Sequence, residues 1–92
     1  MAHTFDELVA MQRAADQAHH RVEELRDQYG PPTYAKWTKT QTDTYETAWR
    51  AWRDLDRDAR IAVNEYARER NESRGRVEAA VQEAVRHPET GS

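Results

Sequence analysis

Four arginines and two tryptophans are concentrated in the stretch TAWRAWRDLDRDARIAV, residues 47 to 63. The arginines recur every three or four residues, so on a helix they would form one stripe beside a tryptophan. A stripe of guanidinium groups next to an aromatic ring could bind phosphates. It could also meet the acidic side of another helix, with the charges setting partner and orientation. The candidate interaction face comprises Trp49, Arg50, Arg53, Arg57 and Arg60.

Acidic residues occupy the other flank of the same helix, at Asp54, Asp58, Glu65 and Glu69. The whole chain has 17 acidic and 14 basic residues, a net charge of -3. Acidic neighbours and a negative net charge oppose attraction to a phosphate backbone, whereas flanks of opposite sign suit packing against another helix. The alternative interpretation is a solvated helix in which an arginine pairs with an acid four residues earlier, as Arg60 would with Asp56. The pattern favours a protein partner over nucleic acid.

A second group of polar residues lies near the middle of the first helix, at Asp16, His19, His20, Glu23 and Glu24. The spacing Asp16-x-x-His19 is used by metal ligands in helical bundles. Such sites require a second matching motif on another helix, and the sequence holds none. We predict a solvated helix face and no metal.

The region from Ala67 to Val85 has the outline of a helix, a turn and a second helix, with arginines near the turn. DNA-binding modules share this outline. The second helix would present mainly valines, alanines and glutamates, which suit self-packing better than base recognition. This helix pair is therefore only the alternative site for nucleic acid.

The residues needed for catalysis are missing from the sequence. It has no cysteine and only three glycines, and no phosphate-binding loop or nucleophile with a neighbouring base is visible. We predict a protein that is not an enzyme and that uses no cofactor.

Composition predicts one small domain. Ninety-two residues form a thin core, and no apolar run approaches the roughly 18 residues of a membrane span. The first ten residues do not resemble a signal peptide, so we expect a cytoplasmic protein without membrane contact. Twelve arginines against two lysines, with fourteen alanines, indicate a bacterial source of high GC content.

The helices that must position these residues can be read from capping signals and spacing. Thr4 to Glu7 fits a capping box, and apolar residues follow at alternating intervals of three and four until Gly30 and Pro31. This pattern predicts a helix over about 5–28. A second helix is expected over about 33–70, because Tyr34, Trp37 and Gln41 continue the apolar spacing, and the alternative is a later start at Asp43. A third is expected over about 74–86, followed by a frayed tail at 87–92.

The apolar positions define a contact line along these helices. The predicted core or dimer seam comprises Leu8, Met11, Val22, Leu25, Tyr45, Trp52, Leu55 and Tyr66. We expect an all-α fold in which the first two helices form an antiparallel, coiled-coil-like hairpin with a short third helix. So few large aliphatic residues leave the aromatic rings uncovered, which predicts a homodimer forming a helical bundle.

These patterns together predict a small helical protein for protein–protein interaction or regulation, without catalytic activity. The alternative is a dimeric nucleic-acid-binding regulator. That regulator would use the Arg flank of the second helix or the C-terminal helix pair.

Overall fold

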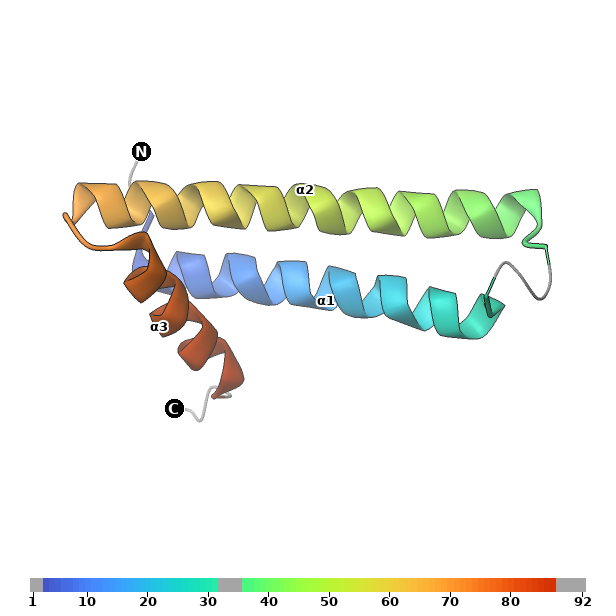
Figure 1. Ribbon diagram of the computed structural model, residues 1–92, viewed down its shortest axis with the longest axis horizontal. Coiled ribbons are helices and arrows are strands. Elements are labelled where there is room, and N and C mark those ends of the chain that lie inside the picture. Colours follow the sequence, from blue (N-terminus) through green and yellow to red (C-terminus); the bar gives the residue numbers. More distant parts are fainter. Residues whose placement is uncertain (1–2, 32–35, 88–92) are drawn as a thin grey trace.

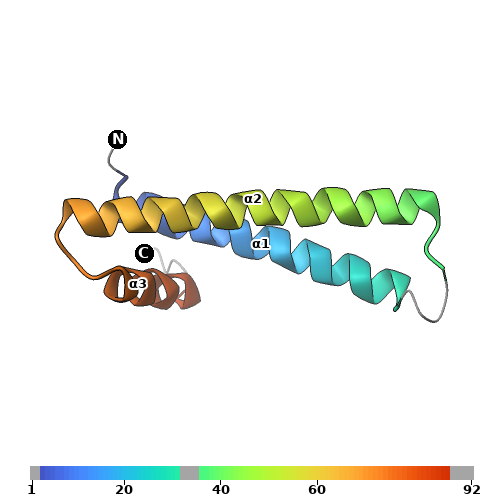
Figure 2. The same cartoon turned by 45° about the horizontal axis from the view of Figure 1, so that its top comes forward.

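The fold is all-helical in a computed structural model that describes residues 3–31 and 36–87. In these residues the chain forms α1 (Phe5–Tyr29), α2 (Lys39–Glu69) and α3 (Arg74–Arg86). α1 and α2 lie side by side and antiparallel, and α3 folds back across one end of this pair (Figure 1, Figure 2). The molecule is elongated, with extents of 50 × 28 × 19 Å.

Local capping fixes both ends of α1. The Thr4 side chain accepts a hydrogen bond from the Glu7 amide at 3.1 Å, and the Glu7 carboxylate accepts one from the Thr4 amide at 2.8 Å. The helix ends at Gly30, whose φ of 75° is a conformation that glycine adopts without steric cost. Proline follows at 31 and lacks an amide hydrogen to continue the helix. The helix therefore covers 5–29, against an expected 5–28.

The start of α2 differs from both expected positions. Residues 36–38 are not helical, and Thr38 caps the helix in a second capping box with Gln41. The Trp37 indole nitrogen donates to the Gly30 carbonyl at 2.9 Å, which ties this segment to the end of α1. An early start near 33 is wrong for residues 36–38, because the Thr38 side chain accepts from the Gln41 amide and so caps the helix at this point. Residues 33–35 lie outside the described part of the chain.

The turn between α2 and α3 is a Schellman motif with asparagine in the glycine position. Asn71 has a φ of 57°, and the Glu72 amide donates to the Ala67 carbonyl at 2.8 Å. Asparagine adopts this left-handed conformation more readily than most side chains. The Ser73 hydroxyl then accepts from the Arg76 amide and starts α3. α2 stops at 69 for this local reason.

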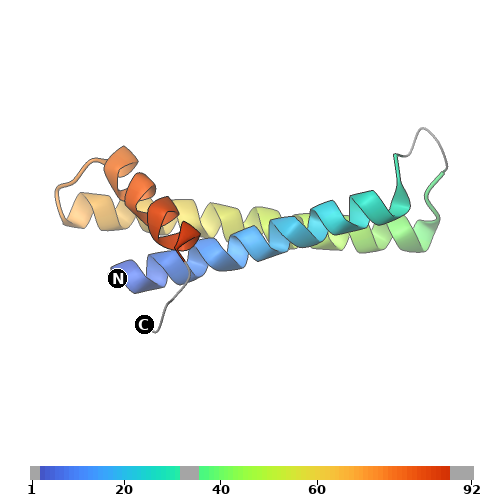
Figure 3. The ribbon, with the colours of Figure 1, turned by 90° about the horizontal axis from the view of Figure 1, so that it is seen from below.

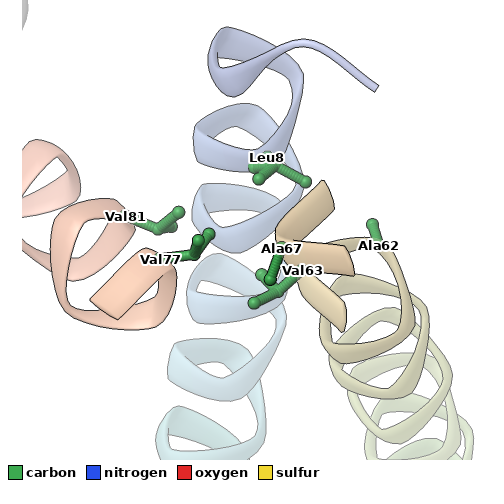
Figure 4. Close-up of a cluster of buried hydrophobic side chains, with 6 residues drawn as sticks. All are labelled: Leu8, Ala62, Val63, Ala67, Val77 and Val81. Atoms are coloured by element: carbon green, nitrogen blue, oxygen red, sulfur yellow. The ribbon is translucent and has the colours of Figure 1, made fainter. Parts of the chain in front are cut away.

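A cluster of buried hydrophobic side chains lies where the three helices meet (Figure 4). It consists of Leu8, Ala62, Val63, Ala67, Val77 and Val81. α3 contributes its two buried valines, and Leu8 of α1 is only 1% exposed. Small alanines on α2 allow its backbone to approach its neighbours closely, so this end has an aliphatic core.

One arginine of α1 holds the far end of α3. The Nη2 atom of Arg13 donates to the carbonyl oxygens of Ala84 at 3.1 Å and His87 at 3.2 Å. These carbonyls belong to the last turn of a helix and its cap, where no amide of the helix itself is available. The arginine therefore ties the last turn of α3 to α1, which α3 crosses obliquely (Figure 3).

Candidate interaction site

The arginines of the candidate interaction face lie on the exposed surface of α2, each next to an acid of the same helix. The nitrogen–oxygen distances are 3.9 Å for Arg50–Glu46, 4.0 Å for Arg53–Asp54, 3.5 Å for Arg57–Asp54 and 3.2 Å for Arg60–Asp56. Exposed pairs of this kind add little stability, about 0.3–0.5 kcal/mol each. They do place a negative charge beside every guanidinium group. The local positive potential of the stripe is correspondingly weak.

Trp49 lies at the edge of this stripe and is 37% exposed. The guanidinium carbon of Arg53 lies 5.1 Å from the centre of the Trp49 ring, within cation–π range. The ring also meets Trp52 edge-on, with centroids 6.3 Å apart. Arg53 and Trp49 therefore form one continuous surface. Through Trp52 this surface reaches the contact between α1 and α2.

Trp52 is half-buried and packs against a histidine of α1. The centroids of the His19 and Trp52 rings are 4.7 Å apart. His19 is itself half-buried, so the prediction of a wholly solvated polar face is wrong at this position. The reason is that the large indole ring reaches beyond the main contact line and covers a flanking residue. Asp16, His20, Glu23 and Glu24 are exposed as expected.

A further aromatic cluster lies at the end of the pair away from α3. Trp37 contacts Tyr29 of α1 and Tyr45 of α2, with centroid distances of 5.4 and 5.0 Å, both edge-on. The sequence places Trp37 within a helix, but its ring instead bridges the two helices from the segment before α2. The Trp37 hydrogen bond to Gly30 depends on tertiary structure, and spacing alone gives no signal for it.

The predicted core or dimer seam residues differ in burial within the single chain. Leu8, Val22 and Leu25 are buried, whereas Met11, Tyr45, Trp52 and Tyr66 are half-buried. The predicted seam does not include four valines that are buried in the structure, Val9, Val63, Val77 and Val81. Val9 is off the contact line of α1, Val63 widens that of α2, and the other two belong to α3.

Leu55 departs from the core expectation, because it is 38% exposed. On α2, Trp52 and Ala59 face α1, and a rotation of 100° per residue turns Leu55 about 60° away from Trp52. The next residue, Asp56, is half-buried. Leu55 is thus a surface residue of the single chain, and a role in a dimer remains a prediction.

The C-terminal turn of α3 contains the one clearly perturbed carboxyl group of the described residues. The Arg86 guanidinium donates to Glu83 at 2.6 Å, and His87 lies 2.6 Å from its other oxygen. The hydrogen bond from Arg86, followed by that from His87, lowers the pKa of Glu83. The contacts therefore favour the folded turn at neutral pH, and they weaken as acid protonates Glu83.

Two further findings bear on function. In residues 3–31 and 36–87, histidines and acids nowhere gather in a group of three or more that could hold a metal ion. Within the same described residues, none of the helices is long and apolar enough to cross a membrane.

These features describe an all-helical protein with many paired charges on its surface and one exposed tryptophan, Trp49, among the described residues. Comparison of the chain with protein-family models, curated proteins and solved structures finds no match.

Proposed function

We propose that this protein is a non-catalytic interaction or regulatory protein that presents helical faces to a protein partner. The observation that carries the proposal is the pairing of each arginine of the candidate interaction face with an acid on the same helix. A phosphate would have to compete with these carboxylates. A protein surface can use both charges and the neighbouring Trp49 ring, because aromatic residues and arginine are favoured at such contacts.

The proposal includes a homodimer built from the α1–α2 pair as a coiled-coil-like hairpin, within a larger helical bundle. The incomplete burial of Tyr45, Trp52 and Tyr66 in one chain supports it. A cytoplasmic location in a bacterium is part of the same proposal, supported by the arginine-rich and alanine-rich composition.

A mobility-shift assay separates this proposal from the nucleic-acid alternative. The wild-type protein is incubated at micromolar concentration with duplex DNA and with single-stranded RNA, at about 50 and 200 mM salt. We expect no shift in either salt. A shift that weakens steeply with salt would overturn the proposal, because displaced counterions are the signature of phosphate contacts.

Two variants locate any binding that appears. Arg53→Glu tests the stripe on α2, and Arg74→Glu tests the turn before α3. Loss of a shift in only one variant would assign nucleic-acid binding to that region. Circular dichroism checks that both variants keep the helical content of the wild type.

A further inference from the structure

The apolar residues near the end of α2 are repeated on α3 at a constant distance along the chain. Each has an apolar counterpart 18 positions later, in the pairs Ala59–Val77, Ala62–Ala80, Val63–Val81, Tyr66–Ala84 and Ala67–Val85. At 3.6 residues per turn, this distance is about five turns of an α-helix. The apolar stripes of α2 and α3 would therefore lie on one face if the chain continued as a single helix through residues 70–73.

Only local contacts at residues 70–73 keep α2 and α3 bent into two helices. Asn71 has a φ of 57°, and the Ser73 hydroxyl starts α3 by accepting from the Arg76 amide. All four residues of this link are exposed, so burial does not hold the bend. A left-handed φ is easiest for glycine, tolerable for asparagine and unfavourable for alanine. The choice between the bent and the straight link therefore depends on the residue at position 71.

The contacts that hold α3 on the α1–α2 pair come from outside the link. Val77 and Val81 of α3 are buried in the cluster that contains Leu8 (Figure 4). Arg13 donates to the carbonyl of Ala84 in the last turn of α3. α3 begins at the end of the pair where α2 stops, and it runs inward from there (Figure 1). The α3 of a second copy, arriving from beyond that end, can make the same contacts in the same direction.

We infer that two copies of this chain form a dimer by exchanging α3. In each copy α2 and α3 become one helix, and α3 lies on the α1–α2 pair of the other copy. Such an exchange reuses the contacts of the single chain, which makes it an accessible route to a dimer. The straight helix also places Glu72 four residues from Arg68 and from Arg76, a spacing at which opposite charges attract.

This dimer differs from the homodimer of the proposed function, whose interface lies along the α1–α2 pair. Trp49 and Arg53 lie more than about four turns before the link, in a part of α2 that the exchange leaves unchanged. The exchanged dimer therefore presents the candidate interaction face twice on one connected body. A protein partner with two matching sites would bind both faces at once and gain apparent affinity.

A matched pair of substitutions at Asn71 tests the exchange. Asn71→Ala disfavours the bent link and favours a helix, whereas Asn71→Gly does the reverse. We expect the straight link to gain about tenfold per chain in the alanine variant over the glycine variant, and the dimer dissociation constant to differ by about a hundredfold. Light scattering after size exclusion, over a range of concentrations, measures the share of molecules with twice the chain mass of 10.8 kDa. The share should decrease from Asn71→Ala through the wild type to Asn71→Gly.

Cross-linking between different chains distinguishes the exchange from other dimers. The chain has no cysteine, so Arg13→Cys and His87→Cys can be introduced into separate chains that also carry Asn71→Ala, unfolded together and refolded as a mixture. Because Arg13 reaches the His87 carbonyl in the folded structure, a short bismaleimide should join the two chains only if α3 of one lies on α1 of the other. The control mixture replaces His87→Cys with Lys39→Cys, at the other end of α2, and should give no cross-linked pair.

The two dimers also differ in length. Exchange joins two molecules at the ends that carry α3, so small-angle X-ray scattering should give a dimer well beyond the 50 Å length of one chain. Two α1–α2 pairs packed along their sides would keep about that length.

Each failure has a separate meaning. Equal shares of dimer in the two Asn71 variants, or equal cross-linking in the test and control mixtures, would overturn the exchange and leave the homodimer of the proposed function standing. A single chain mass for the wild type and both variants up to millimolar concentration would overturn both dimers. A monomeric Asn71→Ala with reduced helical circular dichroism would mean that α3 merely detaches, and would also overturn the exchange.

Discussion

The end of the molecule that contains α3 and the end that lacks it are stabilised in different ways. At the three-helix end, aliphatic side chains from all three helices exclude solvent around Leu8 and Val81. At the two-helix end, Val22 and Leu25 are buried, but the rings of Trp37, Tyr45 and Trp52 remain half-buried. The difference teaches that α3 closes one end with aliphatic side chains, whereas the other end depends on contacts of aromatic rings between α1 and α2.

The two ends should therefore respond differently to truncation, and the largest effect is expected at the three-helix end. Leu8→Ala should lower the free energy of unfolding by about 3 kcal/mol, since it opens a cavity between three helices. For a chain of this size the melting temperature should fall by about 15 °C. Thermal and urea denaturation measure both quantities. Ile61→Ala, which shortens an exposed side chain, should change stability by less than about 0.5 kcal/mol, and equal effects of the two variants would contradict the contrast.

An intermediate effect is expected at the two-helix end. Trp52→Ala removes a half-buried ring and its contact with His19, so it should cost about 2 kcal/mol, below the 3–5 kcal/mol typical of fully buried tryptophan. Chemical denaturation followed by circular dichroism measures the change. Trp49→Ala is the matched control and should cost about 0.5–1 kcal/mol through its contact with Arg53. An unchanged melting temperature in Trp52→Ala would show that this ring does not stabilise the pair.

The smallest effect concerns the attachment of α3 itself. Arg13→Ala removes two hydrogen bonds to the carbonyls that end α3, and it should cost about 1 kcal/mol. Hydrogen exchange should accelerate in the last turn of α3 and remain unchanged at the two-helix end. Arg21→Ala deletes an exposed arginine whose partner is Glu24 of the same helix and should leave α3 protected. Uniform acceleration along the whole chain in Arg13→Ala would contradict a local attachment.

Local signals in the sequence account for the number and approximate extent of the helices. Thr4, Gly30 and Ser73 act within one turn of chain, so their effects can be read without knowledge of the fold. The beginning of α2 cannot be read in this way, because threonines at every second position from Thr38 to Thr44 offer competing caps. The structure selects Thr38 because its partner Gln41 completes a capping box, and Trp37 is bound to Gly30 just before it.

The candidate interaction face was predictable as an exposed stripe, because helical spacing alone places its arginines together. Their individual ion pairs were only partly predictable. Arg50 and Arg60 pair with acids four residues earlier, as the sequence indicates, but Arg57 pairs with Asp54 on the other flank. Residue spacing gives the direction in which each side chain leaves the helix. It does not give the conformation of a long, exposed side chain, which can reach a partner on the other flank.

By itself the sequence determined the helices, since hydrogen bonds and caps within a few residues decide where each begins and ends. Only the tertiary structure decided which sides of those helices are covered. Val9 is buried although it lies off the contact line of α1, and Leu55 is exposed although the spacing of apolar residues on α2 includes it. That choice depends on contacts between residues far apart in the chain, such as Arg13 with Ala84. A periodic pattern within one helix carries no information about them.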